Sequence, residues 1–378
     1  MECPIALNAM TRRTLLSVLA AAVAARLGPP GRAAQKAASK VVLITLGGIR
    51  RQESWSPQGL RYIPHLYRDL LPQSLFFPYT FNQGVTSHFN TISSILTGVW
   101  QHVDDWGSEK PANPTLFQDF QSQTHAGPEQ TWVVTSNKQL TANISPGANV
   151  ILSKQLMVEA VERIITGQSA RSRLEREQIL AEMTAVLDTD HERIGWGVPS
   201  ESAFRDPAIK QTFLSALTAF IHSPDAPATG DELTFLIARE VLRRVSPAML
   251  MINFSDMEVA HSGTYSLHLG GIRGADRLCH RTWEFIQSTP SLKDCTTLVI
   301  MNEFGRDPDG SSTNGFFNHR TDTESCRLAW TMVLGPAAGK PLVVERTVRQ
   351  IDIAPSIASW MGFESSKAAG ARLPEFHA

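Results

Sequence analysis

Short runs of consecutive apolar residues recur along the chain and predict buried β-strands. The clearest run spans residues 41–46, contains Val, Leu and Ile with a single Thr, and ends at Gly47-Gly48. A run without apolar/polar alternation is typical of a strand that is covered on both faces, as in a parallel sheet. Four more runs predict strands at residues 132–135, 250–254, 298–301 and 329–334.

Between most of these runs, apolar residues recur at helical spacing. In residues 272–286 one face of the predicted helix carries Ile272, Ala275, Cys279, Thr282 and Ile286. A helix near the end of the chain is predicted to begin at Asp352, with Pro355 in its first turn, and to stop at Gly362. Strands that alternate with helices predict an α/β fold with a doubly wound, mostly parallel sheet.

Residues 152–245 show a different pattern. Apolar residues recur there at helical spacing in three stretches, around residues 179–187, 213–221 and 233–241, and no comparable strand run interrupts them. We therefore expect a mostly helical insertion or cap at residues 152–245, and an α/β core built from residues 39–151 and 246–378. The length of 378 residues suits a large α/β domain that carries an insertion.

Residues 1–38 have the layout of an export signal and linker. Arg12 and Arg13 precede an apolar stretch, residues 15–25, that is too short for a membrane span of about 20 residues. The paired arginines favour the twin-arginine export machinery, while an ordinary secretory signal or an uncleaved anchor stays open. We expect a periplasmic or extracellular protein without a stable membrane span.

Composition narrows the class of protein only slightly. Apolar residues make up 42% of the chain, charged residues 19%, and the net charge is −1, so a large nucleic-acid interface is not expected. Outside the signal the cysteines are Cys279, Cys295 and Cys326. A Cys295–Cys326 disulfide and three free thiols are both compatible with this spacing.

Polar residues directly after the predicted strands are candidates for a site, because ligands of open α/β sheets bind beyond the carboxyl ends of the strands. Asp256 and His261 follow the strand at residues 250–254, and His268 lies on the next predicted helix. A carboxylate and an imidazole on one such loop can bind a divalent cation. The alternative is that Asp256 caps a turn and His261 is a surface residue.

A second group of polar residues follows the strand at residues 298–301. Its possible metal ligands are Glu303, Asp307, Asp309 and His319. Arg306 and Arg320 are candidates for holding an anion. The alternative for this segment is a polar surface loop.

The third group, Thr86, Ser87 and His88, precedes a predicted helix that runs to Thr97-Gly98. The helix dipole and the free N–H groups of the first turn favour an anion at this position. Capping of the helix by a hydroxyl group is the alternative.

Taken together and in this order, the three groups resemble the alkaline phosphatase superfamily, which includes sulfatases and nucleotide phosphodiesterases. The resemblance covers most of residues 41–105 and 248–362. It rests on the segments 43–50, 95–98, 302–306 and 351–358, on Asp256 with His261, and on His319. It implies an alkaline-phosphatase-like α/β fold with a divalent-metal site.

The departures from that family's pattern divide the expected site into two halves. Gly47 stands where the family carries a metal-binding Asp, and Glu303-Phe304 stands where it carries an Asp-His pair. His88 occupies the nucleophile position, so a formylglycine-dependent sulfatase, which needs a Cys there, is disfavoured. A two-metal mechanism needs both ions, and only one half of this site keeps its ligands.

The resemblance therefore implies a hydrolase of phosphate or sulfate esters that acts on a small anionic ester with one divalent ion, Zn²⁺ or Mn²⁺. Asp256, His261 and His319 are the expected ligands, with Glu303 as a further candidate. Ser87 or a bound water is the expected nucleophile, His88 a base or an additional ligand, and Arg306 or Arg320 the group that steadies the anion. The alternative is a non-catalytic binding protein with at most a structural ion.

Overall fold

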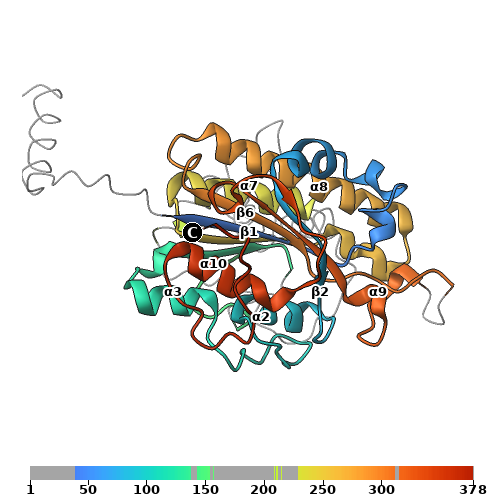
Figure 1. Ribbon diagram of the computed structural model, residues 1–378, viewed down its shortest axis with the longest axis horizontal. Helices are drawn as coiled ribbons and strands as arrows, with labels where there is room; N and C mark the ends of the chain where they lie inside the picture. Colours follow the sequence, from blue (N-terminus) through green and yellow to red (C-terminus); the bar gives the residue numbers. More distant parts are fainter. Residues whose placement is uncertain are drawn as a thin grey trace, which may run out of the picture. The chain divides into compact units, whose positions relative to one another are not determined.

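The computed structural model describes residues 39–137, 143–153, 229–310 and 315–377, with a few single positions between 156 and 214. In this part of the chain nine strands form one sheet, in the order β4-β3-β5-β1-β6-β7-β2-β8, with β9 paired to β2 (Figure 1). The strands are β1 Lys40–Leu46, β2 Leu75–Phe81, β3 Thr131–Thr135, β4 Asn149–Leu152, β5 Met249–Phe254, β6 Thr296–Asn302, β7 Leu328–Leu334, β8 Leu342–Val343 and β9 Val348–Arg349. The fold is thus the expected α/β class with a mostly parallel sheet.

Helices cover both faces of this sheet. The α-helices are α2 His88–Thr97, α3 Leu116–Thr124, α7 Gly230–Arg244, α8 Tyr265–Ser288, α9 Glu324–Arg327 and α10 Ile353–Met361. Short helices are η1 Arg51–Glu53, η2 Gly59–Tyr62, η3 Leu66–Leu70 (a π-helix), η4 Leu71–Gln73, η5 Pro128–Gln130, η6 Asp256–Ser262, η7 Gly315–Phe317, η8 Pro336–Ala338 and η9 Gln350–Asp352. In Figure 1, α7 and α8 lie over one face, and α2, α3 and α10 lie over the other.

Alternation along β1 divides the core into two hydrophobic clusters. Val42, Ile44 and Leu46 belong to the cluster under α7 and α8, whereas Val41 and Leu43 belong to the cluster under α2, α3 and α10. Successive side chains of a strand point to opposite faces, so a strand covered on both sides must be apolar at every position. This requirement explains why β1 has no polar face.

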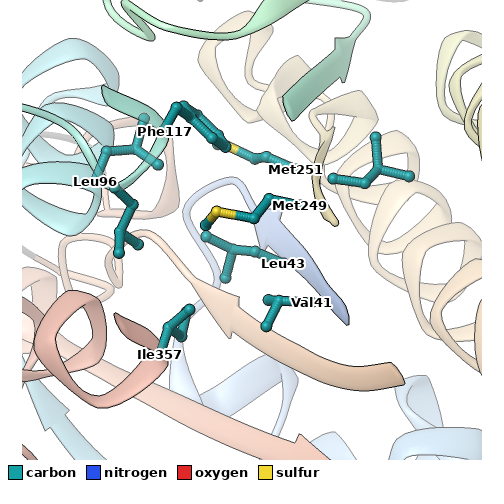
Figure 2. Close-up of a pocket in the computed structure, with 9 residues that line it drawn as sticks. Val41, Leu43, Leu96, Phe117, Met249, Met251 and Ile357 are labelled. Atoms are coloured by element: carbon teal, nitrogen blue, oxygen red, sulfur yellow. The ribbon is translucent and has the colours of Figure 1, made fainter. Parts of the chain in front are cut away.

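The cluster under α2, α3 and α10 retains one small apolar cavity, shown in Figure 2. Its volume is about 10 Å³, roughly the minimum for one water molecule. Its lining residues are Val41, Leu43, Leu96, Leu116, Phe117, Met249, Leu250, Met251 and Ile357. Because no polar side chain lines this space, we treat it as a dry packing defect in the core.

The pairing of the strands brings several chain segments to one edge of the sheet. β1 is parallel to β5 and β6, and Leu46 pairs with both Phe254 and Asn302, so the three strands end level. β7 runs antiparallel to β6, and β2 runs antiparallel to β7. The carboxyl end of β2 and the amino end of β7 therefore reach the same edge, which collects all three polar groups that the sequence singled out.

The five strands predicted from apolar runs are confirmed as β1, β3, β5, β6 and β7. The helices predicted at residues 272–286, after Asp352, before Thr97-Gly98 and around residues 233–241 are α8, α10, α2 and α7. The sequence pattern missed β2, which contains Pro78. Proline cannot donate a ladder hydrogen bond and argues against a strand. The register between β2 and β7 shifts between Phe77 and Thr80, and this irregularity accommodates the proline.

Most of the predicted insertion, including the helical stretches around residues 179–187 and 213–221, lies outside the described residues. Its last helix, α7, contacts β5, β3 and α8 and is part of the layer that covers the sheet. The predicted export signal, residues 1–38, also lies outside the described residues. Within the described part, no helix is both long and apolar enough to cross a membrane. Cys279, Cys295 and Cys326 are free thiols.

Candidate metal centre

Four side chains from three segments meet at the edge of the sheet. His88 is the first residue of α2, Glu258 and His261 lie in η6 after β5, and His319 lies in the loop between η7 and α9. Each of the four offers one ligand atom, and these atoms all lie within 4.8 Å of one another. The ends of the parallel strands and the start of the antiparallel strand β7 lie at the same edge. The segments beside them bring three imidazoles and one carboxylate together there.

Three of the separations between these ligand atoms match those of a first coordination sphere. The Oε2 atom of Glu258 lies 3.2 Å from Nε2 of His88 and 3.3 Å from Nε2 of His261. Nε2 of His261 lies 3.1 Å from Nε2 of His319. Tetrahedral ligands about 2.1 Å from a zinc ion are about 3.4 Å apart. The group therefore has the size and the donor types of a zinc-class site.

His88 is held so that its Nε2 atom faces the other three residues. Its Nδ1–H group donates to Oε2 of Glu303 over 2.6 Å. Nε2 is fully buried and, among the described residues, has no hydrogen-bond partner, although Oε2 of Glu258 is near. A carboxylate that fixes the tautomer of a metal-binding histidine is a common arrangement. A buried imidazole nitrogen without a hydrogen-bond partner is available to bind a metal ion.

The ring of His319 is oriented in the same manner. Its Nδ1–H donates to the backbone carbonyl of Thr86 over 2.6 Å, which leaves Nε2 to face His261. The rings of His88 and His261 each stand roughly perpendicular to the ring of His319, at 71° and 70°. Phe304 stacks on the ring of His319, with ring centroids 4.3 Å apart. The imidazoles of His88 and His319 are thus fixed by contacts outside the group.

Glu258 reaches the group because Gly47 has no side chain. A Cβ atom at Gly47 would lie 2.2 Å from Oε1 of Glu258, so only glycine admits the carboxylate. The N–H of Gly48 donates to the same oxygen over 2.5 Å, and Arg306 forms an ion pair with Oε2. Burial alone would raise the pKa of Glu258, but the charges of Arg306 and His88 outweigh it and hold the pKa well below its usual value.

Arg306 is fully buried and its donors are directed at protein atoms. Besides the ion pair, Nε donates to the carbonyl of Gly48 over 2.8 Å, and Nη1 donates to the carbonyls of Phe316 and Phe317. Arg320 is 43% exposed and pairs with Asp307 over 3.0 Å. Of the two arginines expected to steady an anion, Arg306 is thus committed to Glu258 and Arg320 remains open to solvent.

Glu303 supports the group without being one of its four members. Its Oε2 accepts from His88, and its Oε1 accepts from Nδ2 of Asn253 over 2.9 Å. Burial would lower the pKa of His88, but the carboxylates of Glu258 and Glu303 raise it well above the usual value. Glu303 therefore orients His88 and balances its charge.

The structure does not bring Asp256 to the histidines. Its Oδ2 atom accepts from the backbone N–H of Asp231 over 3.1 Å, and its own N–H donates to Oδ2 of Asp231. Glu258, two residues later, contributes the carboxylate instead. In a 3₁₀-helix residues three apart face the same side, so Glu258 and His261 share a face of η6. The three-residue spacing of Glu258 and His261 is visible in the sequence and could have identified Glu258 as a candidate ligand. The position directly after a strand points only to Asp256.

Ser87 lies between two residues that define the group. Thr86 before it holds His319, and His88 after it is a member. Ser87 is the N-cap of α2, and its Oγ atom accepts from Nδ2 of Asn90 over 2.8 Å. The hydroxyl group therefore stands at a helix N-terminus, where the dipole favours a negatively charged group.

No family model matches the sequence, and no curated protein matches it. Solved structures do resemble it. A protein in the alkaline phosphatase superfamily from Vibrio parahaemolyticus aligns with 98% of this chain and 80% of its own, at a TM-score of 0.56 and 13% identity. The alkaline phosphatase PafA aligns with 90% of this chain and 99% of its own, at 0.53 and 10%. A putative sulfatase from Bacteroides thetaiotaomicron aligns with 89% of this chain and 74% of its own, at 0.53 and 11%.

Proposed function

We propose, on the premise of the alkaline-phosphatase-like fold that the chain shares with these structures, that it is a metal-dependent hydrolase of phosphate or sulfate esters. One divalent ion, Zn²⁺ or Mn²⁺, would be held by His88, Glu258, His261 and His319. The observation that carries the proposal is the convergence of three imidazole nitrogens and one carboxylate oxygen. Nε2 of His88 is buried there, 3.2 Å from Oε2 of Glu258, and has no hydrogen-bond partner within the part of the chain that the structure describes. Imidazole nitrogens favour zinc over magnesium or calcium.

A divalent ion in such a site supplies Lewis-acid polarisation of an ester oxygen. The residues around the ligand group orient the ligands and control their charge. Glu303 and the carbonyl of Thr86 fix the tautomers of His88 and His319, and Arg306 keeps Glu258 ionised. With neutral imidazoles, the carboxylates of Glu258 and Glu303 and the guanidinium of Arg306 leave one negative charge in excess. A dication would therefore make the centre positive by one charge and attractive to an anionic ester.

For the attacking group, the geometry leaves Ser87 or a water molecule. Nδ1 of His88 is bonded to Glu303, and Nε2 faces the other members of the ligand group, so we assign His88 as a ligand rather than a base. Ser87 at the N-terminus of α2 is placed where a developing negative charge is favoured. Arg320 is paired with Asp307 but is 43% exposed, so of the two arginines it is the one that an incoming anion would reach.

A non-catalytic binding protein with a structural ion is the second candidate. Two observations favour it. The ring of Phe304 stacks on His319 where the family pattern leads us to expect a further ligand, and Arg306 is sealed inside the protein. Both features suit a site that has kept one ion and lost the second.

The two candidates are separated by measuring bound metal and ester turnover on the same preparations. Phosphate monoesters, phosphate diesters and sulfate esters would be offered to the wild type, to His261→Ala and to Ser87→Ala, with His102→Gln as an exposed-histidine control. Turnover that His261→Ala abolishes and His102→Gln retains would support the hydrolase. Loss in Ser87→Ala would identify the serine as nucleophile, and retention would favour water. Bound metal without turnover of any ester would overturn the hydrolase in favour of the binding protein.

We also propose that the protein is exported to the periplasm or the extracellular space. The proposal rests on the arginine pair and the short apolar stretch at residues 12–25.

A further inference from the structure

A second group of metal-binding side chains lies far from the candidate metal centre. His65 precedes the π-helix η3, Asp69 lies within it, and His280 lies on α8. One ligand atom from each falls within 4.8 Å of the others. His280 is fifteen residues into α8 from Tyr265, the end that follows η6, which at 1.5 Å per residue is about 22 Å. The two groups are therefore separate.

The backbone at His65 is fixed by a buried carboxylate of α8. Asp276 accepts from the N–H groups of His65 and Leu66 over 3.1 and 2.7 Å. Asp276 and His280 are four residues apart, so they lie on the same face of α8. The contact that docks η3 on α8 thus also places His65 beside His280. Burial of Leu66 and Leu70 in the core holds η3 in this position.

The two histidines of this group meet at the carboxylate of Asp69. Oδ2 of Asp69 lies 2.7 Å from Nδ1 of His65 and 3.8 Å from Nε2 of His280. A further carboxylate oxygen, from Glu284, lies 3.6 Å from Nδ1 of His280. With Asp276 nearby, two imidazoles are surrounded by three carboxylates, which favours a cation. The side chains of His65, Asp69 and His280 are 38%, 44% and 23% exposed, so an ion from solvent can reach them.

We propose that His65, Asp69 and His280 form a second site for a divalent transition-metal ion of the zinc class, with water completing the coordination. Two imidazoles and one carboxylate are a zinc donor set, whereas magnesium and calcium prefer oxygen ligands. The two rings are stacked, with centroids 4.7 Å apart and planes at 14°. Ligation therefore requires one ring to turn about its Cβ–Cγ bond, which partial exposure permits. The ion links η3 to α8 and stabilises that contact.

The test titrates Zn²⁺ alone into the full chain that carries His261→Ala and His319→Ala, so that the candidate metal centre no longer contributes. We expect this protein to bind one ion per chain by calorimetry. Adding His280→Gln, or separately His65→Gln, should remove that binding, and adding His102→Gln should leave it. Mg²⁺ should give no binding heat at the same concentration. Far-ultraviolet circular dichroism of every variant checks that each one is folded.

Two results would overturn the proposal: no zinc binding in the His261→Ala/His319→Ala protein, or binding that survives both His280→Gln and His65→Gln. The first would mean that the stacked histidines and Asp69 form a surface hydrogen-bonded contact without an ion. A parallel titration of His280→Gln in the otherwise unchanged chain keeps the two proposals apart. If the candidate metal centre binds no ion, this variant loses the only bound zinc. If that centre does bind, one ion remains.

Discussion

Glu258 carries a buried negative charge that two neighbours and one backbone N–H hold in place. Arg306 and His88 face its Oε2 atom, and Gly48 donates to its Oε1 atom. Removing one partner of a buried ion pair leaves the other uncompensated, which costs about 3–5 kcal/mol. At the scale of single residues, Glu258 therefore links the stability of the fold to the proposed metal centre.

We predict that Glu258→Gln abolishes metal binding at the centre, while Asp256→Asn retains it. The first change removes a ligand and leaves Arg306 unpaired, so the free energy of unfolding should also fall by about 3 kcal/mol. Ion content after dialysis, measured in the His280→Gln background, and urea unfolding check both effects. Loss of the ion in Asp256→Asn, with retention in Glu258→Gln, would reassign the carboxylate ligand to Asp256.

His268 gives the protein a specific sensitivity to acid. Its Nδ1–H donates to the carbonyl of Met257 over 2.8 Å, and its Nε2 is buried without a hydrogen-bond partner among the described residues. Burial, aided by the charge of Arg306, lowers the pKa of His268 to about 4. The unfolded chain takes up the proton first, near pH 6.5. The stability from this residue is thus present above pH 6.5 and is lost as the pH falls toward 4.

We predict that His268→Gln weakens this dependence on pH. The wild type should lose about 2 kcal/mol of unfolding free energy from this residue between pH 7 and pH 5, and the variant, which keeps a donor for Met257, should not. Urea unfolding at the two pH values measures the difference. Equal losses in both proteins would show that His268 is not the responsible group.

At the scale of elements, β1 offers a matched pair of positions for testing how the core is packed. Val41 lines the small cavity on the side of α2, α3 and α10 (Figure 2), whereas Val42 is buried in the cluster under α7 and α8. We predict that Val41→Ile raises the free energy of unfolding by up to about 0.8 kcal/mol, the value of one buried methylene. Val42→Ile should lower it by about 1 kcal/mol through overpacking. Urea unfolding of both variants checks the signs; the same sign in both would contradict this account of the cavity.

The elements that sequence analysis predicted are those whose own residues determine them. A strand covered on both faces must be apolar throughout, so β1, β5 and β6 are visible as uninterrupted runs. β2 is not, because Pro78 contradicts a strand and only the pairing with β7 accommodates it. The residues of the candidate site divide in the same way, into those predicted from their own segment and those that depend on contacts with other segments. His261 and His319 were predicted from strand ends, whereas Glu258 depends on the turn of η6 and on the open space above Gly47.

At the scale of the whole molecule, we predict that the arginine pair directs export. Replacing Arg12 and Arg13 by Lys keeps the charge of the segment but removes the paired guanidinium groups that the twin-arginine route requires. The changed protein should accumulate in the cytoplasm of a bacterial host, while the wild type appears in the periplasmic fraction. Fractionation followed by immunoblotting distinguishes the two. Unchanged export would favour an ordinary secretory signal.

The candidate metal centre is a property of the whole fold, because its four side chains come from residues 88, 258, 261 and 319. Only the pairing of β1 with β5 and β6, and the antiparallel insertion of β7 beside β2, brings these segments to one edge (Figure 1). A sequence pattern does not give the distances between residues that are far apart in the chain. It can indicate which residue types lie near the edge, but not which of them meet.

The most direct test of the proposed centre is X-ray diffraction from crystals grown with zinc, with data collected on both sides of the zinc absorption edge. We predict an anomalous peak about 2.0–2.2 Å from Nε2 of His88, His261 and His319 and from Oε2 of Glu258. The same peak should be absent in His261→Ala crystals. A zinc-loaded crystal with no peak among these four atoms, or with the peak at Asp256 instead, would contradict the account.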